Sequence, residues 1–123
     1  PAYNEEAGII GSIRSLLSIE YPQYEVIVIN DGSTDRTLEK LIEHFGLRPV
    51  YRVIRRQLEA KEIKMIYRSP AYPQLFVLDK ENGGKADALN AGINVARYPY
   101  ICSIDGDSVL ERRAFLKVMK PIV

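Results

Sequence analysis

The chain has 123 residues, of which 46% are hydrophobic and 27% are charged, and its net charge is +1 at pH 7. This length suits one folded domain, and the composition is that of an ordinary globular protein rather than a disordered one. The small net charge argues against binding through bulk electrostatics, so no nucleic acid is expected as a partner. No apolar run approaches the roughly 18 residues that a membrane span requires, and we expect a soluble, cytoplasmic domain.

The first predicted helix follows a polar loop at residues 1–6. Asn4 in this loop is a residue type that favours helix N-caps, and two glutamates after it suit the first turn. Apolar residues then recur at helical spacing over residues 9–17, and Tyr21-Pro22 ends the helix. Because such a loop follows a strand in alternating folds, we expect a strand before residue 1 and a domain that is truncated at that end.

Three predicted strands each run into a polar turn and a helix. The β-branched run 26–29 is typical of a buried parallel strand, and it precedes a helix that Gly46 stops. A strand over 75–78 precedes a helix over 85–96 with Leu89, Ile93 and Ala96 on one face. A strand over 100–104 precedes a helix over 111–119. This alternation predicts an α/β domain with a mostly parallel sheet, helices on both faces, and ligands at the carboxyl ends of the strands.

Residues 47–74 interrupt the alternation. Apolar residues at 47, 50, 51, 54 and 58 predict an amphipathic helix, and residues 63–67 predict a short strand or extended segment. The stretch also carries seven Lys and Arg residues, at positions 48, 52, 55, 56, 61, 64 and 68. Two interpretations stay open: a solvated helix face, or a basic amphipathic element that rests on an anionic membrane surface or on another part of a longer protein.

Two carboxylates, Asp105 and Asp107, follow the last predicted strand. Residues i and i+2 of an extended chain point to the same side, so the two carboxylates can converge on one point. Oxygen ligands of this kind suit Mg or Mn, with water and substrate phosphates as the remaining ligands. Taken alone, the pattern is explained equally well by a strand that ends in an Asp-Gly turn.

The polar turns would meet at one edge of the sheet and complement one another. Tyr3 offers a stacking surface, Asp31 an acceptor for a ring N–H, and the Asp105/Asp107 pair a metal site. Gly83-Gly84-Lys85 begins a helix, where backbone N–H groups and a Lys favour a diphosphate. Together these groups predict a nucleoside diphosphate ligand with a divalent cation.

The ordered motifs resemble those of family 2 glycosyltransferases of the GT-A fold. They are PAYNE at 1–5, NDGSTD at 30–35, GGKADALN at 83–90 and DGD at 105–107, and the similarity spans nearly the whole chain except residues 47–74. The third motif looks most like that of membrane-associated members that synthesise polysaccharides. The resemblance implies that residues 1–123 form one partial, Rossmann-like nucleotide-sugar-binding domain, truncated at both ends, with a basic insertion at about 47–74. It also implies a protein at the cytoplasmic face of the cell membrane.

The same resemblance assigns roles to particular residues. The implied nucleotide-sugar-binding residues are Ala2, Tyr3, Glu5, Asp31, Lys85, Asp87 and Asp105. Among them Asp31 would bind the uracil of UDP and Lys85 would lie near the diphosphate. Asp105 and Asp107 would form the DxD motif that holds Mg or Mn against the UDP phosphates. Asp87 matches the motif, but a structural role explains it as well.

The implied activity is inverting transfer of a sugar from a UDP-sugar to a growing glycan or another acceptor. A carboxylate deprotonates the acceptor hydroxyl, which attacks the anomeric carbon in line while the metal stabilises the departing UDP. We identify no catalytic base in the chain, because Glu111 begins a predicted helix and suits its first turn. The base is expected beyond Val123, and the isolated chain is predicted to bind UDP weakly and to transfer nothing.

Three other functions compete with this one. A hydrophobic run followed by Asp-x-Asp, with Val109 two residues later, also matches the nucleophile motif of haloacid dehalogenase-like phosphatases. That motif normally opens its domain, whereas here about a hundred residues precede it. A sugar nucleotidyltransferase would need an Arg-bearing, Gly-rich loop, which residues 1–4 do not provide. A non-catalytic nucleotide-sugar-binding module remains the third alternative.

Overall fold

The computed structural model describes residues 1–18, 24–52, 54, 58–97, 100–101 and 120–121. Its helices are α1 (Ile9–Leu17), α2 (Thr37–Phe45) and α3 (Lys85–Val95). Its strands are β1 (Val26–Asp31), β2 (Arg48–Pro49), β3 (Ile63–Arg68), β4 (Leu75–Lys80), β5 (Tyr100–Ile101) and β6 (Lys120–Pro121). The helices predicted over residues 9–17, before Gly46 and over residues 85–96 are thus confirmed, as are the strands predicted at 26–29, 63–67 and 75–78. The predicted helix over 111–119 lies outside the described residues.

The main sheet has four strands in the order β1-β4-β3-β2. β1 and β4 are parallel, with Val26 opposite Leu75 and Asp31 opposite Lys80. β3 is antiparallel to both β4 and β2. The prediction of a mostly parallel sheet is therefore wrong for the described strands, because residues 47–74 add β3 beside β4 and β2 beside β3, both in antiparallel pairings. β5 and β6 form a separate antiparallel pair.

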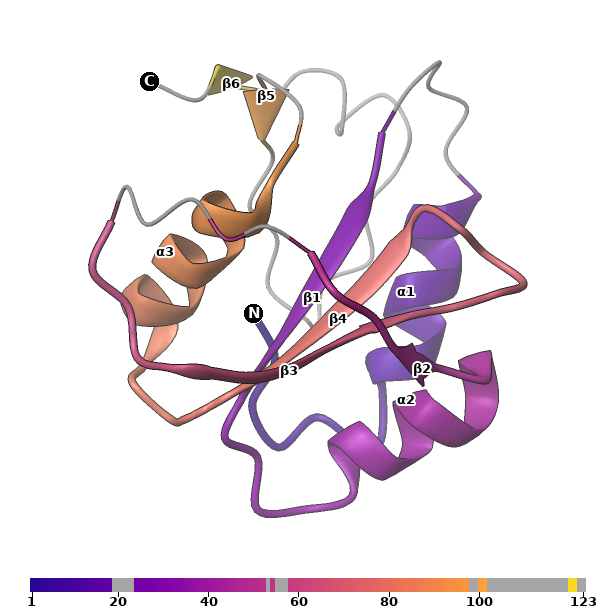
Figure 1. The fold of residues 1–123 in the computed structure, drawn as a ribbon. Coiled ribbons are helices and arrows are strands. Elements are labelled where there is room, and N and C mark those ends of the chain that lie inside the picture. Colours follow the sequence, from indigo (N-terminus) through magenta and orange to yellow (C-terminus); the bar gives the residue numbers. More distant parts are fainter. Residues whose placement is uncertain (19–23, 53, 55–57, 98–99, 102–119, 122–123) are drawn as a thin grey trace.

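Helices cover both faces of the sheet, as predicted (Figure 1). Val26 and Val28 of β1 belong to the core cluster with α1 and α2, whereas Ile29 belongs to the cluster with α3. This alternation follows from the two-residue period of a strand, and it explains why a strand buried on both faces is a continuous apolar run.

The buried face of α3 differs from the predicted one. Ala88, Ala91 and Val95 are buried, whereas Leu89 and Ile93 are only partly buried. The small residues let α3 approach β1 so closely that a Cβ atom on Gly92 would lie 3.0 Å from Cδ1 of Ile29. Close backbone approach, rather than large apolar side chains, therefore defines this helix face.

The amphipathic helix predicted after residue 47 is wrong for the described residues. They form β2 and then an irregular segment that crosses the α3 face of the sheet (Figure 1). The N–H of Val50 donates to the carbonyl of Ile66 (2.8 Å), and Ile54 packs against the α3 cluster. Arg52, which a helix would have exposed, is buried in an ion pair with Glu25 at 2.6 Å. Contacts with the sheet thus replace the hydrogen bonds that a helix would have made.

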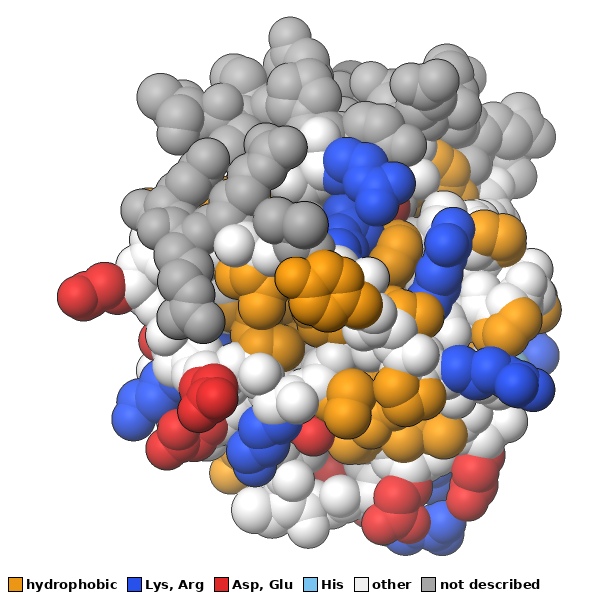
Figure 2. Space-filling model, in the orientation of Figure 1, with side chains coloured by type: hydrophobic (Ala, Val, Ile, Leu, Met, Phe, Trp, Pro, Cys, Tyr) orange, Lys and Arg blue, Asp and Glu red, His pale blue; other side chains and the backbone are white. Residues whose placement is uncertain are grey.

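The basic character of residues 47–74 is only partly displayed at the surface. Arg52 is buried with Glu25, whereas Arg68 is exposed although its Nε donates to the carbonyl of Pro73 at 2.8 Å. Arg48 and Lys64 are exposed. On the face of the molecule that Figure 2 draws, hydrophobic side chains lie near the middle, with Lys and Arg side chains beside them. In the described part of the chain, no helix has both the length and the apolar character needed to cross a membrane.

Candidate functional site

Three of the four polar turns meet at one edge of the sheet. Ala2 forms a parallel bridge to Asn30: its N–H donates to the carbonyl of Ile29 (2.7 Å), and its carbonyl accepts the N–H of Asp31 (2.8 Å). Because β1 and β4 are parallel and in register, Asp31 and Lys80 end side by side at the same edge. The turns after Ala2, β1 and β4 therefore converge as predicted, whereas residues 102–119 lie outside the described part of the chain.

Asp31 is the centre of this edge and is only 4% exposed. Its Oδ1 accepts hydrogen bonds from Nζ of Lys80 (2.6 Å) and from the N–H of Gly83 (3.0 Å). Its Oδ2 accepts one from the N–H of Gly84 (2.9 Å). A carboxylate offers about four acceptor positions. Among the described residues, three donors are found, so Oδ2 retains the capacity for one more hydrogen bond.

The glycine pair before α3 is bonded to Asp31, and this changes its predicted role. The N–H groups of Gly83 and Gly84 point to the carboxylate and not to a free anion site. Gly84 has φ of 91°, and a Cβ atom on Gly83 would lie 2.5 Å from Oδ2 of Asp87, so both positions require glycine. The first turn of α3, which begins at the exposed Lys85, is the part of this motif that can face a diphosphate.

Lys80 is a site residue that the sequence analysis missed. Its side chain is 0% exposed and forms ion pairs of 2.6 Å with both Asp31 and Asp87. Burial alone would lower the pKa of Lys80, but the hydrogen bonds to Asp31 and Asp87 outweigh it and raise this pKa above its usual value. The available signal was a Lys close behind the apolar run 75–78, because a Lys that a buried strand carries inward needs charged partners.

Asp87 makes structural contacts. Its hydrogen bond from Lys80 holds its pKa below the usual range, and the N–H of Lys61 contributes by donating to both carboxylate oxygens, at 3.0 and 3.1 Å. These contacts favour the structural interpretation of Asp87. The carboxylate links α3 to the segment that precedes β3.

The N-terminal loop is fastened to the turn after β1 by Asn4. This residue does not cap α1, which begins at Ile9 with Gly8 at the N-cap position. Asn4 has φ of 50°, its N–H donates to Oγ of Ser33 (3.0 Å), and its Oδ1 accepts the N–H of Thr34 (2.7 Å). The loop positions Tyr3, a residue that is 48% exposed.

Glu5 and Asp35 extend the same contact between the two loops. The N–H of Glu5 donates to Oγ1 of Thr37 at 2.9 Å, and the N–H of Glu6 donates to Asp35. Burial alone would raise the pKa of Asp35, but hydrogen bonds from Thr37 and Glu6 hold it below its usual value. The first two sequence motifs therefore form one structural unit.

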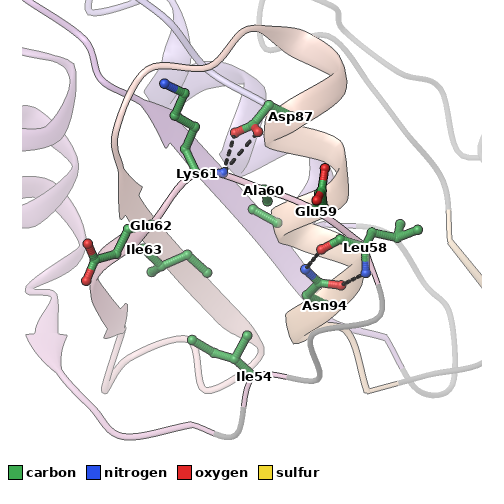
Figure 3. A pocket seen from close by; sticks show the side chains of 10 residues that line it. Ile54, Leu58, Glu59, Ala60, Lys61, Glu62, Ile63, Asp87 and Asn94 are labelled. Carbon is green, nitrogen blue, oxygen red and sulfur yellow. Dashed lines mark hydrogen bonds between the residues drawn. The ribbon is translucent and has the colours of Figure 1, made fainter.

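A pocket of about 630 Å³ lies beside this edge, between α3 and the segment before β3 (Figure 3). Ile54, Leu58 and Ile63 give it an apolar side. Asp87 and Asn94 reach across from α3 to the backbone of Lys61 and Leu58, as the dashed lines in Figure 3 show. The polar atoms that line the pocket from α3 are thus already engaged in holding the segment in place.

The candidate metal ligands Asp105 and Asp107 lie outside the described residues, as does the rest of the turn after Ile104. Within the described ranges, no group of three or more His, Cys, Asp or Glu side chains is arranged to hold a metal ion. The metal site therefore remains a prediction from the sequence.

Comparison with known proteins identifies the family. The model for the family described as glycosyl transferase family 2 matches residues 1–61 and 58–123. The chain belongs to this family. The resemblance inferred from the motifs is thereby confirmed, and a family 2 glycosyltransferase is favoured over the phosphatase and nucleotidyltransferase alternatives.

Several curated proteins are similar to this family 2 chain. A poly-beta-1,6-N-acetyl-D-glucosamine synthase of Staphylococcus epidermidis is 35% identical over 110 residues, which are 89% of the chain and 21% of that protein. The synthase of the same name from Staphylococcus aureus strain COL is 31% identical over 113 residues, or 91% of the chain and 21% of that protein. The chain thus spans about a fifth of the length of these relatives. No solved structure matches it.

Proposed function

We propose that this chain binds the UDP part of a UDP-sugar, in a protein that transfers the sugar with inversion to a growing glycan or another acceptor. On this proposal residues 1–123 form one partial GT-A domain. The observation that carries the proposal is the buried carboxylate of Asp31, which has one acceptor position left at the carboxyl edge of the sheet. Such a position suits the N3–H donor of uracil. The names of the relatives favour a polymer of N-acetylglucosamine as the product.

The other residues at this edge complement Asp31. Ala2, Tyr3 and Glu5 belong to the loop bridged to β1, and the half-exposed ring of Tyr3 suits stacking on a base. Lys85 begins α3, where its charge and the helix N-terminus favour a diphosphate. Asp87 contributes indirectly, through Lys80 and Lys61.

Asp105 and Asp107 are the proposed ligands of Mg or Mn, because two carboxylates one residue apart supply the oxygen donors that these ions prefer. The ion would neutralise charge that develops on the departing UDP. The base that activates the acceptor is proposed to lie beyond Val123, so the 123 residues alone are expected to transfer no sugar. For the protein that carries them we propose a place at the cytoplasmic face of the cell membrane, where the exposed basic side chains of residues 47–74 face the lipid surface.

Calorimetric titration of the purified chain with UDP, GDP and ADP, each with and without Mn, tests the proposal. UDP is expected to bind most tightly, and chelation of Mn to weaken it. Asp31→Asn removes one charge-assisted hydrogen bond and is expected to lower the affinity for UDP by about 10-fold or more. Glu39→Gln, an exposed change on α2, is the control and is expected to leave UDP binding unchanged.

Two results would contradict the proposal. Equal affinity for all three nucleotides would show that no uracil-specific acceptor exists at this edge. UDP binding that is unchanged by chelation of Mn would show that the metal does not contribute to nucleotide binding. Sugar transfer by the isolated 123 residues would instead contradict the expected position of the catalytic base, and it would leave the assignment of Asp31 intact.

A further inference from the structure

We propose that Lys80 is a positioning residue of the nucleotide site, which sets the preference for uracil by holding the carboxylate of Asp31 in one orientation. This inference rests on the proposed function, since it assumes that Asp31 accepts the N3–H of the base. It concerns a residue that no sequence motif pointed to.

The contacts of Lys80 show that it acts through other residues. Its Nζ lies 2.6 Å from Oδ1 of Asp31, 2.6 Å from Oδ2 of Asp87 and 2.6 Å from the carbonyl oxygen of Glu81. An ammonium group has three N–H donors. All three have partners within the protein, and the side chain is 0% exposed, so Lys80 is not placed to contact a ligand itself.

Lys80 fixes the direction in which the remaining acceptor of the Asp31 carboxylate points. Lys80 and Gly83 both bind Oδ1, and Gly84 binds Oδ2, which leaves the remaining acceptor position on Oδ2. Without Lys80, two backbone N–H groups are the donors that the described residues would still offer the carboxylate, which could then rotate or shift. The position and direction of the remaining acceptor would then no longer be fixed.

The fixed acceptor matters for the choice of base. Uracil presents an N3–H donor, whereas cytosine presents an N3 acceptor at the same place. A site built to hydrogen-bond one group rejects an analogue that lacks it, because the buried polar group is left without a partner. A carboxylate in one orientation is therefore expected to discriminate UDP from CDP more strongly than a mobile one.

Lys80 also balances charge next to the expected diphosphate. It lies between Asp31 and Asp87, so one ammonium serves two carboxylates. Removal of Lys80 would leave two carboxylates without their shared cation, and like charges in a low-dielectric site repel strongly. Both the direction of Asp31 and the local charge therefore depend on this one side chain.

The test is the ratio of UDP to CDP affinity, measured by calorimetry on the protein that carries this chain, in wild type and in Lys80→Met. Wild type is expected to prefer UDP, and the substitution to lower the ratio by about 10-fold, the effect of losing one oriented charge-assisted hydrogen bond. Lys64→Met makes the same chemical change at an exposed position of β3 and is expected to keep the wild-type ratio. Thermal unfolding of each variant checks that it is folded.

A second variant covers the case in which Lys80→Met does not fold. Lys80→Gln keeps two N–H donors and loses the charge and the reach to both carboxylates, so the same fall in the ratio is expected. A folded variant that keeps the wild-type ratio, even with both affinities reduced, would overturn the inference and show a purely structural role. A wild-type protein without preference for UDP would instead overturn the proposed function, and the inference with it.

Discussion

The two faces of the sheet are held by different kinds of contact. On the α1 and α2 face, apolar side chains such as Ile13, Leu41 and Val77 form the core cluster. On the α3 face, a smaller apolar cluster is supplemented by hydrogen bonds between side chains of α3 and the backbone of residues 58–61: Asp87 accepts the N–H of Lys61, and Asn90 and Asn94 donate to carbonyl oxygens. Apolar contacts have no direction, whereas hydrogen bonds fix positions. The first face is therefore expected to supply stability, and the second to position the site.

The largest expected effect is a loss of stability in Leu41→Ala, which tests whether stability and positioning of the site depend on different faces of the sheet. Leu41→Ala empties a fully buried position between α2 and the sheet, and about 2–5 kcal/mol of unfolding free energy is expected to be lost. UDP affinity of the folded protein is expected to stay unchanged, because Leu41 belongs to the α1 and α2 face. Urea denaturation and calorimetry measure the two quantities. Leu41→Met, which nearly conserves volume, is the control. A large change in UDP affinity for Leu41→Ala would contradict the division of roles between the two faces of the sheet.

The ion pairs of the α3 side predict a dependence on pH. The pKa of Lys80 is raised, so its stabilising contribution is complete below the ordinary value of about 10.4 and is lost as pH rises through the higher pKa of the folded state. The pKa of Asp87 is lowered, so its contribution is present above about 3.9 and is lost as pH falls through the lower folded value. Denaturation midpoints are therefore expected to fall at both extremes.

Two variants separate these alkaline and acid contributions. Lys80→Gln is expected to remove the alkaline fall, and Asp87→Asn part of the acid fall. Lys64→Met is expected to keep both. An alkaline fall of the same size in Lys80→Gln would show that other groups cause it.

A smaller effect is expected from the hydrogen bonds that hold the segment before β3. Asn94 donates to the carbonyl of Leu58 (2.8 Å) and accepts its N–H (3.0 Å). Asn94→Ala is expected to cost about 1–2 kcal/mol of unfolding free energy and to speed hydrogen exchange of the Leu58 amide. Asn90→Ala, which loses a single bond to the carbonyl of Glu59, is the control and is expected to cost about half as much. Equal costs for the two variants would show that the paired bonds at Leu58 do not act as a clamp.

The sequence predicts those parts of the fold that depend on local pattern. The β-branched run of β1 and Gly46 at the end of α2 place their elements correctly, because strand burial and a left-handed C-cap leave signals within a few residues. Residues 47–62 are predicted wrongly because their apolar spacing suits a helix. In the structure Val50 bonds to Ile66 of β3, and Arg52 pairs with Glu25, which directly precedes β1. Contacts between segments far apart in the chain decide such a stretch, and local periodicity does not record them.

The candidate site is likewise predictable from the sequence only where local pattern and strand order decide it. The order of the motifs predicts that Ala2, Asp31 and the turn after β4 lie at one edge, because parallel strands share their carboxyl ends. It does not predict that the N–H groups of Gly83 and Gly84 are occupied by Asp31, since this depends on how closely α3 approaches β1.

The contacts of Asn4 have a consequence for the rate of ligand binding. Two loops about thirty residues apart in sequence are joined by its hydrogen bonds to Ser33 and Thr34 before any ligand arrives. Ordering flexible side chains on binding costs roughly 0.5–1.5 kcal/mol each, and here that loss of freedom is already part of folding. On the proposed function, these two loops are therefore expected to contribute no slow closure phase to nucleotide association.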